Sequence, residues 1–78
     1  MRLALADAEL APSAVQYVNA HATGTPLGDI AESLAIMEVL GPNIPVSSTK
    51  GLTGHTLGAC GGIEAIFCIQ MMQESFLA

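Results

Sequence analysis

Positive charge is the scarcest feature of this sequence. Its 78 residues contain two Lys and Arg residues in total against seven Asp and Glu, which gives a formal net charge of −5 at pH 7. Proteins that bind nucleic acid neutralise phosphates with clustered Lys and Arg side chains. The composition therefore argues against a nucleic-acid partner, and it makes the position of each cation informative.

The sequence also lacks a hydrophobic run long enough to cross a membrane. Its most apolar segment, residues 56–72, is shorter than the roughly 18–20 residues that a transmembrane helix needs, and it carries Glu64. Near the N-terminus, Asp7 and Glu9 interrupt any apolar run, so no secretory signal is predicted. We expect no membrane span and a cytoplasmic protein, with the mitochondrion or plastid as the alternative if the organism is eukaryotic.

Cysteine is limited to Cys60 and Cys68, which lie eight residues apart in a segment expected to be helical. At a rise of 1.5 Å per residue they are about 12 Å apart, beyond the roughly 7 Å Cα separation that a disulfide allows. We therefore expect reduced core thiols and a reducing compartment. Two widely spaced histidines and these two cysteines do not form a zinc-ligand pattern, so no metal is expected.

Apolar residues, by contrast, are abundant: 51% of the chain is hydrophobic and 12% is charged. A chain of this length buries only roughly 60–65% of its unfolded surface when it folds. We expect apolar surfaces that further chain or a second subunit covers. The length allows one small domain or one piece of a larger fold.

The hydrophobic pattern predicts helices and strands in alternation, which indicates an α/β layered fold. The expected elements are a helix over 2–10, a strand within 14–20, a helix ending near Leu40, a strand over 46–48 and a helix over 56–73. The segments 21–29 and 49–55 are expected to be loops that follow strands, where α/β sheets hold ligands.

Two of the expected helices carry more specific predictions. Asp29 is predicted to cap the middle helix, with Glu32 completing a capping box. Its buried side is expected to include Ile30, Leu34, Ile36, Met37 and Leu40.

The last helix is apolar nearly all round, which predicts burial on every side. Gly58, Gly61 and Gly62 would allow other backbone segments to approach it closely.

Each predicted strand is followed by a histidine. His21 directly follows the first strand, and His55 lies beyond the second. From its position alone, His21 is better interpreted as an ordinary loop residue, but a second histidine after the second strand weakens that interpretation. If the two converge, two neutral imidazoles could donate hydrogen bonds to a developing enolate. Lys50 is either a turn lysine or a nearby cation that disfavours imidazolium.

Two carboxylates are left with open interpretations. Glu32 is either a helix N-terminal carboxylate favoured by the helix dipole or a partner for Lys50. Glu64, inside an apolar helix, needs either a buried partner or an exposed gap.

The segments "VNAHATGTPLGDIAE" (18–32) and "VSSTKGLTGHTLGACGGIEAI" (46–66), in this order, resemble the C-terminal part of the β-ketoacyl-acyl carrier protein synthases, the condensing enzymes of fatty acid synthesis. The resemblance covers about residues 2–73. It implies a thiolase-like layered α/β/α/β/α fold, of which residues 1–78 are an incomplete fragment of the C-terminal domain. The spellings "TPLGD" and "SSTKG" favour stand-alone fatty acid enzymes over modular polyketide ones.

The resemblance also implies a role for individual residues. In the family, two histidines bind the thioester carbonyl of malonyl-carrier and promote its decarboxylation, and they correspond to His21 and His55. The family's active-site lysine and its associated glutamate fall on Lys50 and Glu32. The threonines that hold the phosphopantetheine arm correspond to Thr23 and Thr25. The implied partners are acyl carrier protein and a second subunit of a homodimer, with no cofactor beyond the carrier's phosphopantetheine.

Three departures from the family pattern stand out. Ala22 replaces a more frequent Gly, interpreted as a mild change, and Cys60 replaces a small Ala. The family's nucleophilic cysteine lies in a preceding segment, and neither Cys60 nor Cys68 matches it, so the isolated chain is expected to be inactive.

Two other functional classes are considered. One alternative is a non-catalytic module that binds the carrier or packs as a structural piece. A hydrolase using Ser47 or Ser48 is disfavoured, because neither lies in a G-x-S-x-G elbow.

Overall fold

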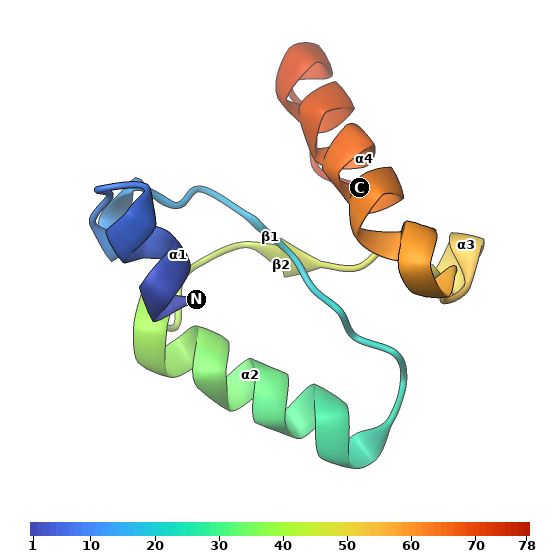
Figure 1. The fold of residues 1–78 in the computed structure, drawn as a ribbon, viewed down its shortest axis with the longest axis horizontal. Coiled ribbons are helices and arrows are strands. Elements are labelled where there is room, and N and C mark those ends of the chain that lie inside the picture. Colours follow the sequence, from blue (N-terminus) through green and yellow to red (C-terminus); the bar gives the residue numbers. More distant parts are fainter.

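The structure, a computed structural model, describes all of residues 1–78 and contains four helices and two short strands (Figure 1). The elements in chain order are α1 (Arg2–Asp7), β1 (Val18–Asn19), α2 (Pro26–Leu40), β2 (Val46–Ser47), α3 (Lys50–Thr53) and α4 (Cys60–Glu74), with 3₁₀ turns η1 (Pro12–Ala14) and η2 (Leu57–Ala59). The alternation of helices and strands predicted from the sequence is confirmed.

The two strands pair in parallel, with Val18 opposite Val46 and Asn19 opposite Ser47. The ladder is extended by the Ala20 N–H, which donates to the Ser47 carbonyl at 2.8 Å. Helix α2 connects the strands, so β1, α2 and β2 form a β-α-β unit. Parallel pairing brings the carboxyl ends of both strands to one edge, and the segments that carry the histidines leave the sheet there.

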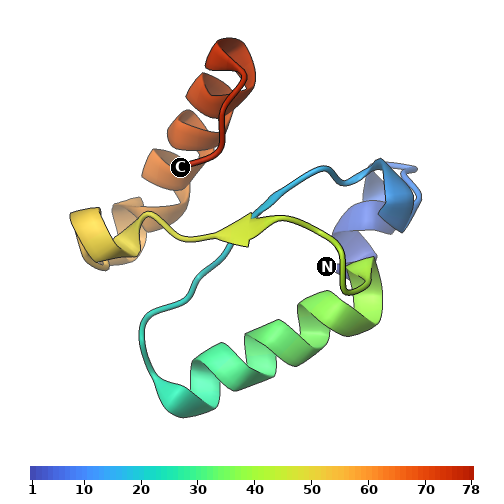
Figure 2. The same ribbon diagram turned by 180° about the vertical axis from the view of Figure 1, so that it is seen from behind.

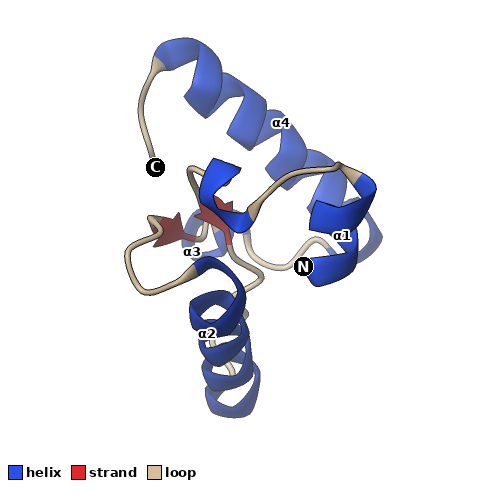
Figure 3. Ribbon diagram, turned by 90° about the vertical axis from the view of Figure 1, so that its left-hand side faces the viewer, coloured by secondary structure: helices blue, strands red, loops and turns tan.

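The helices lie on opposite sides of this small sheet. Figure 3 shows the strands between α2 on one side and α4 on the other, and Figure 2 shows the same separation from behind. This is the arrangement of a partial layered α/β domain. None of the helices is long and apolar enough to span a membrane.

Helix α2 begins three residues earlier than its predicted cap. Thr25 is the extended N-cap residue and Pro26 takes the first helical position, where its missing N–H costs nothing. The Asp29 N–H already donates to the Thr25 carbonyl at 2.8 Å. The predicted Asp29–Glu32 capping box is therefore wrong, whereas the predicted end at Leu40 is confirmed, with Gly41 at φ +90° closing the helix.

The other boundaries also shift. Helix α1 stops at Asp7, and strand pairing is limited to Val18–Asn19 because β1 has only β2 as a partner. Residues 50–53, expected to be a loop, form one helical turn that Gly54 ends at φ +67°. The last helix begins at Cys60, after the turn η2.

The buried core is small and the predicted buried faces are mostly exposed. Four hydrophobic residues are buried: Ala20, Ile36, Cys60 and Met71. On α2, Ile30, Leu34 and Met37 are more than half exposed, so the predicted buried side is confirmed only at Ile36. On α4, Ile66, Ile69 and Met72 are exposed, and space beside Gly58, Gly61 and Gly62 is open. The prediction that α4 is buried on every side is therefore wrong for this chain, because there is too little protein around the helix for its apolar side chains to pack against.

Candidate active site

The imidazole rings of His21 and His55 lie close together. The ring centroids of His21 and His55 are 5.0 Å apart and the rings are nearly perpendicular, at 88°. Both residues are exposed. His21 follows β1 and His55 follows β2 and α3, so the parallel sheet brings together residues 34 positions apart. The predicted convergence of His21 and His55 is confirmed.

The backbone fixes the proton arrangement of His55. The Leu57 N–H donates to His55 Nδ1 at 3.3 Å, so Nδ1 is an acceptor in this geometry. A neutral imidazole that accepts at Nδ1 carries its proton on Nε2. His55 Nε2 is therefore the nitrogen that can donate a hydrogen bond to a ligand.

Lys50 forms an ion pair with Glu64 and not with Glu32. The Lys50 side chain is 5% exposed and that of Glu64 is 16% exposed, so the pair is largely removed from water. Hydrogen bonding to Glu64 raises the pKa of Lys50 above its ordinary value of 10.5, and the same contact lowers the pKa of Glu64 below 4.5. The interpretation of Glu32 as the partner of Lys50 is therefore wrong.

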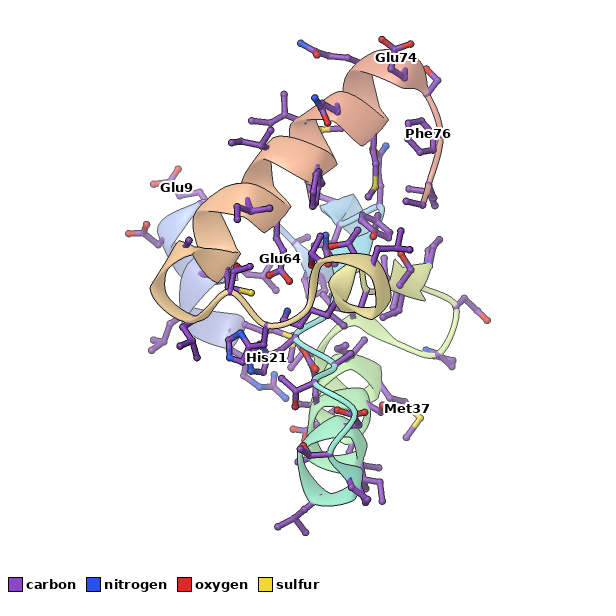
Figure 4. The ribbon with its side chains drawn as sticks, turned by 90° about the vertical axis from the view of Figure 1, so that its right-hand side faces the viewer. Glu9, His21, Met37, Glu64, Glu74 and Phe76 are labelled. Atoms are coloured by element: carbon purple, nitrogen blue, oxygen red, sulfur yellow. The ribbon has the colours of Figure 1, made fainter.

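The Lys50–Glu64 pair also changes the expected electrostatics near the histidines. The Lys50 contact is the main cause of the lowered pKa of Glu64, and the charge of His21 adds a smaller contribution. Figure 4 labels both Glu64 and His21, which lie close to each other in that view. The sequence suggested that Lys50 is an isolated cation beside the imidazoles. In the structure the Glu64 carboxylate offsets the charge of the Lys50 ammonium.

Glu32 instead supports the loop that carries His21. Its Oε1 accepts the His21 N–H at 2.8 Å and its Oε2 accepts the Ala22 N–H at 2.9 Å. One carboxylate from α2 thus holds two successive backbone donors, which is a strong charge-assisted arrangement. Glu32 acts on the position of His21, and the structure gives it no contact with Lys50.

The two motif threonines lie side by side at the start of α2. The hydroxyls of Thr23 and Thr25 are 3.2 Å apart. Gly28 makes room for this pair, because a Cβ there would be 2.5 Å from Thr25 Oγ1. Thr23 is half-buried and Thr25 is exposed, so the pair presents hydroxyl groups next to His21 in the chain.

The serines are engaged elsewhere. The Ser47 hydroxyl lies 2.7 Å from the Tyr17 hydroxyl and also donates to the Ala78 carbonyl, while Ser48 Oγ accepts the Lys50 N–H at 3.3 Å. No hydrogen bond joins either serine to a histidine. The geometry gives a serine hydrolase no support.

Sequence reasoning missed the role of Glu64. The available signal was that Glu64 is the only Asp or Glu between Lys50 and Glu74. A buried ammonium requires a carboxylate, and this segment offers just one. Cys60 and Cys68 are free, as predicted, with Cys60 buried and Cys68 half-buried.

Comparison with known proteins identifies the family. The family model of the β-ketoacyl synthase C-terminal domain matches residues 1–78. The chain is 49% identical, over its whole length, to 3-oxoacyl-[acyl-carrier-protein] synthase 2 of Staphylococcus aureus, of which it covers 20%. It is 50% identical over 91% of its length to the Synechocystis sp. protein of the same name, of which it covers 18%.

The chain therefore spans about a fifth of the length of these curated relatives. The matched family also accounts for the fold, because this domain has a thiolase-like α/β architecture and the chain shows part of such a layered arrangement. The histidine pair, the buried Lys50–Glu64 pair and the β-α-β unit that positions them lie in a chain that belongs to the β-ketoacyl synthase family.

Proposed function

We propose that this chain carries the decarboxylating part of the active site of a 3-oxoacyl-[acyl-carrier-protein] synthase, an acyltransferase that elongates acyl chains in fatty acid biosynthesis. The observation that carries the proposal is the meeting of His21 and His55, with ring centroids 5.0 Å apart at one edge of the sheet. The full condensation also needs a nucleophile, which we assign to the part of such an enzyme outside these 78 residues.

The proposed chemistry is a decarboxylative Claisen condensation. His21 and His55 donate hydrogen bonds to the thioester carbonyl oxygen of malonyl-carrier. The bond between the carboxylate carbon and C2 breaks, CO₂ leaves, and the electron pair forms an enolate whose oxygen the two imidazoles stabilise. C2 of the enolate then attacks the acyl thioester on the enzyme, which forms the new C–C bond and releases the enzyme thiolate.

The partners follow from the same proposal. The malonyl group arrives on the phosphopantetheine of acyl carrier protein, and the hydroxyls of Thr23 and Thr25, 3.2 Å apart, bind the amides of that arm. No further cofactor is required. The names of the relatives, which specify acyl-carrier-protein, support this partner. We assign the protein to the reducing cytoplasm, with both thiols free, and to a homodimer when intact.

The test is a chimera in which these 78 residues replace the matching segment of the Staphylococcus aureus relative. We expect this chimera, called the chimera below, to release CO₂ from malonyl-carrier and to extend an acyl chain. His21→Ala and His55→Ala should each slow CO₂ release by about 10²- to 10³-fold, as losses of oxyanion donors do. Leu52→Ala is the matched control, because Leu52 lies in α3, three residues before His55, and is 94% exposed. Equal activity of the histidine variants and the control would contradict the proposal.

A non-catalytic carrier-binding or structural module is the alternative that this experiment excludes or supports. Such a module would retain carrier binding and stability when either histidine is replaced, with no catalytic rate to lose. The 78-residue chain without the rest of the enzyme is proposed to be inactive in condensation. Incubation with acyl and malonyl thioesters, followed by mass spectrometry for extended product, checks this expectation.

A further inference from the structure

Helix α2 has apolar side chains on two sides, and the chain covers only one of them. Toward the sheet, Ile36 is buried and the Glu32 carboxylate holds two backbone N–H groups of the segment after β1. On the other side of the helix, four large apolar residues are 52% to 87% exposed. We call this set the α2 stripe, and it consists of Leu27, Ile30, Leu34 and Met37. Figure 4 labels Met37, whose side chain points away from the rest of the molecule.

The position of α2 leaves the α2 stripe on an outer surface. Helix α2 lies on one side of the sheet and α4 lies on the other (Figure 3). At about 100° per residue, the α2 stripe lies on the side of the helix turned away from Ile36 and from the sheet. A helix that covers a sheet normally presents polar side chains on that outer side. A contiguous apolar row there indicates an interaction surface.

The spacing of the α2 stripe indicates a helix as its partner. Its members follow one another at intervals of three, four and three residues, which is the spacing of a helix that pairs with another helix. The row is also symmetric about Glu32, with members two and five residues away on each side. An antiparallel pair centred there packs Leu27 against Met37 of the partner subunit. It packs Ile30 against Leu34 of the partner subunit, so the stripe is complementary to itself, as a two-fold interface requires.

The charges of α2 favour the same antiparallel pair. Asp29 and Glu32 lie on the sheet side of the helix, where both are half-buried. Glu38 lies at the edge of the α2 stripe, and Arg2 offsets its charge at 2.7 Å. In the antiparallel pair Glu38 is level with the first turn of the partner's helix, where the helix dipole favours a carboxylate. Helix α2 contains no Lys or Arg, which disfavours an anionic lipid surface as the partner.

We propose that the α2 stripe is a self-association surface, through which two copies of this chain pair by antiparallel α2 helices. The two-fold axis passes between the helices at the level of Glu32. This pairing is independent of the proposed condensation chemistry, because the α2 stripe lies on the side of the helix away from Glu32 and the histidines. One helix pair forms a small interface, so we expect a dissociation constant of about 1–100 μM.

The test places charges at two positions that face each other in the antiparallel pair. Ile30→Lys and Leu34→Glu are made separately in the chimera, and association is measured by analytical ultracentrifugation over a series of concentrations. Leu52→Lys is the control, because Leu52 is 94% exposed on a different helix, α3. Every variant is compared with the unsubstituted chimera, so association through the surrounding sequence is the same in all samples.

We expect Ile30→Lys and Leu34→Glu each to weaken association by at least about tenfold, because a charge replaces an apolar side chain inside the contact. Leu52→Lys should associate as the chimera does. An equimolar mixture of Ile30→Lys and Leu34→Glu should recover association, because the new ammonium of one copy faces the new carboxylate of the other. Parallel helices do not bring these two positions together, so recovery is specific to the antiparallel pair.

Three outcomes overturn the proposal. The first is equal association of the chimera and all variants, and the second is weaker association that the mixture does not recover. The third is a lower melting temperature of Ile30→Lys and Leu34→Glu with no change in association, which would show that the rest of the synthase covers the α2 stripe. CO₂ release is recorded on the same unsubstituted chimera. Its absence would contradict the proposed function and leave the association result standing.

Discussion

At the scale of single residues, Ala22 has a backbone conformation that suits glycine. Its φ is +33°, in the left-handed region, and its N–H is held there by Glu32 Oε2 at 2.9 Å. This conformation costs an L-residue about 1–2 kcal/mol. The sequence interpretation treated Ala in place of Gly as mild because it compared side chains only, and the structure shows that the backbone makes the difference.

We therefore predict that Ala22→Gly stabilises the protein. Relief of the left-handed strain exceeds the added entropy of the unfolded chain, which leaves a gain of about 0.5–1 kcal/mol. The measurement is denaturant unfolding of the chimera. Ala20→Gly is the control, because Ala20 is buried beside the sheet without a positive φ and should lose about 1 kcal/mol. A loss of stability in both variants would contradict the prediction.

The Lys50–Glu64 pair predicts a defined dependence of stability on pH. The pKa of Glu64 is lowered below 4.5, so its contribution is full above pH 4.5 and is lost as pH falls through the lowered value. The pKa of Lys50 is raised above 10.5, so its contribution is full below pH 10.5 and is lost as pH rises through the raised value. The stabilising window therefore covers the whole neutral range.

Glu64→Gln should remove the contribution of the Lys50–Glu64 pair to stability. We expect the difference in melting temperature between the chimera and its Glu64→Gln variant to stay constant near neutral pH and to shrink toward both extremes. The control is Glu38→Gln, since Glu38 pairs with Arg2 at 2.7 Å but both side chains are about 70% exposed. Exposed pairs contribute little. A Glu64→Gln difference as small as that of Glu38→Gln would count against a buried pair.

At the scale of elements, Glu32 ties α2 to the segment that follows β1. Its two oxygens accept the N–H groups of His21 and Ala22 at 2.8 and 2.9 Å. We predict that Glu32→Ala destabilises the chimera by about 2–3 kcal/mol, because two backbone donors lose a charged acceptor. Glu32→Gln keeps one acceptor oxygen and should lose about 1 kcal/mol.

The kinetic readout separates this positioning role from a general effect on stability. Because Glu32 places His21, the same order of variants should appear in CO₂ release at temperatures where all variants are folded. Asp29→Asn is the matched control on α2, since Asp29 makes no side-chain hydrogen bond in the structure. Normal rates in Glu32→Ala would show that the His21 loop needs no support from α2.

The order of elements and the meeting of the histidines could be predicted from the sequence, for a physical reason. Two polar loops that follow neighbouring parallel strands must leave the sheet at the same edge. The sequence offered Glu64 as a candidate partner for Lys50, because it is the only acidic residue between Lys50 and Glu74. The contact itself could not be predicted, because it depends on how α4 turns against α3, which no local pattern records. The start of α2 was readable in principle, since Thr is a preferred N-cap residue and Pro a preferred first helical residue.

At the scale of the whole molecule, the chain exposes more surface and is less compact than a folded monomer of its mass is expected to be. Its accessible surface is 5539 Å², whereas a folded monomer of 8.0 kDa is expected to expose about 4,450 Å². Its radius of gyration is 12.7 Å, against about 11.5 Å expected for a domain of this length. Fifteen large hydrophobic residues are exposed and four hydrophobic residues are buried. The hydrophobic pattern indicated an apolar side on α2 and an α4 that is apolar nearly all round, but it cannot supply the surface that covers them.

This imbalance predicts how the 78-residue chain behaves by itself. Folding must offset about 1–2 kcal/mol of backbone entropy per residue, and four buried hydrophobic residues supply too little burial for a cooperative core. We expect a broad thermal transition by circular dichroism and strong binding of the dye ANS, which reports exposed apolar surface. In the chimera, where the rest of a synthase surrounds α2 and α4, we expect one sharp transition and little dye binding. A sharp transition with no dye binding by the chain alone would show that the β-α-β unit is stable without a covering surface, and the histidine pair would then be formed before any other part of the enzyme packs against it.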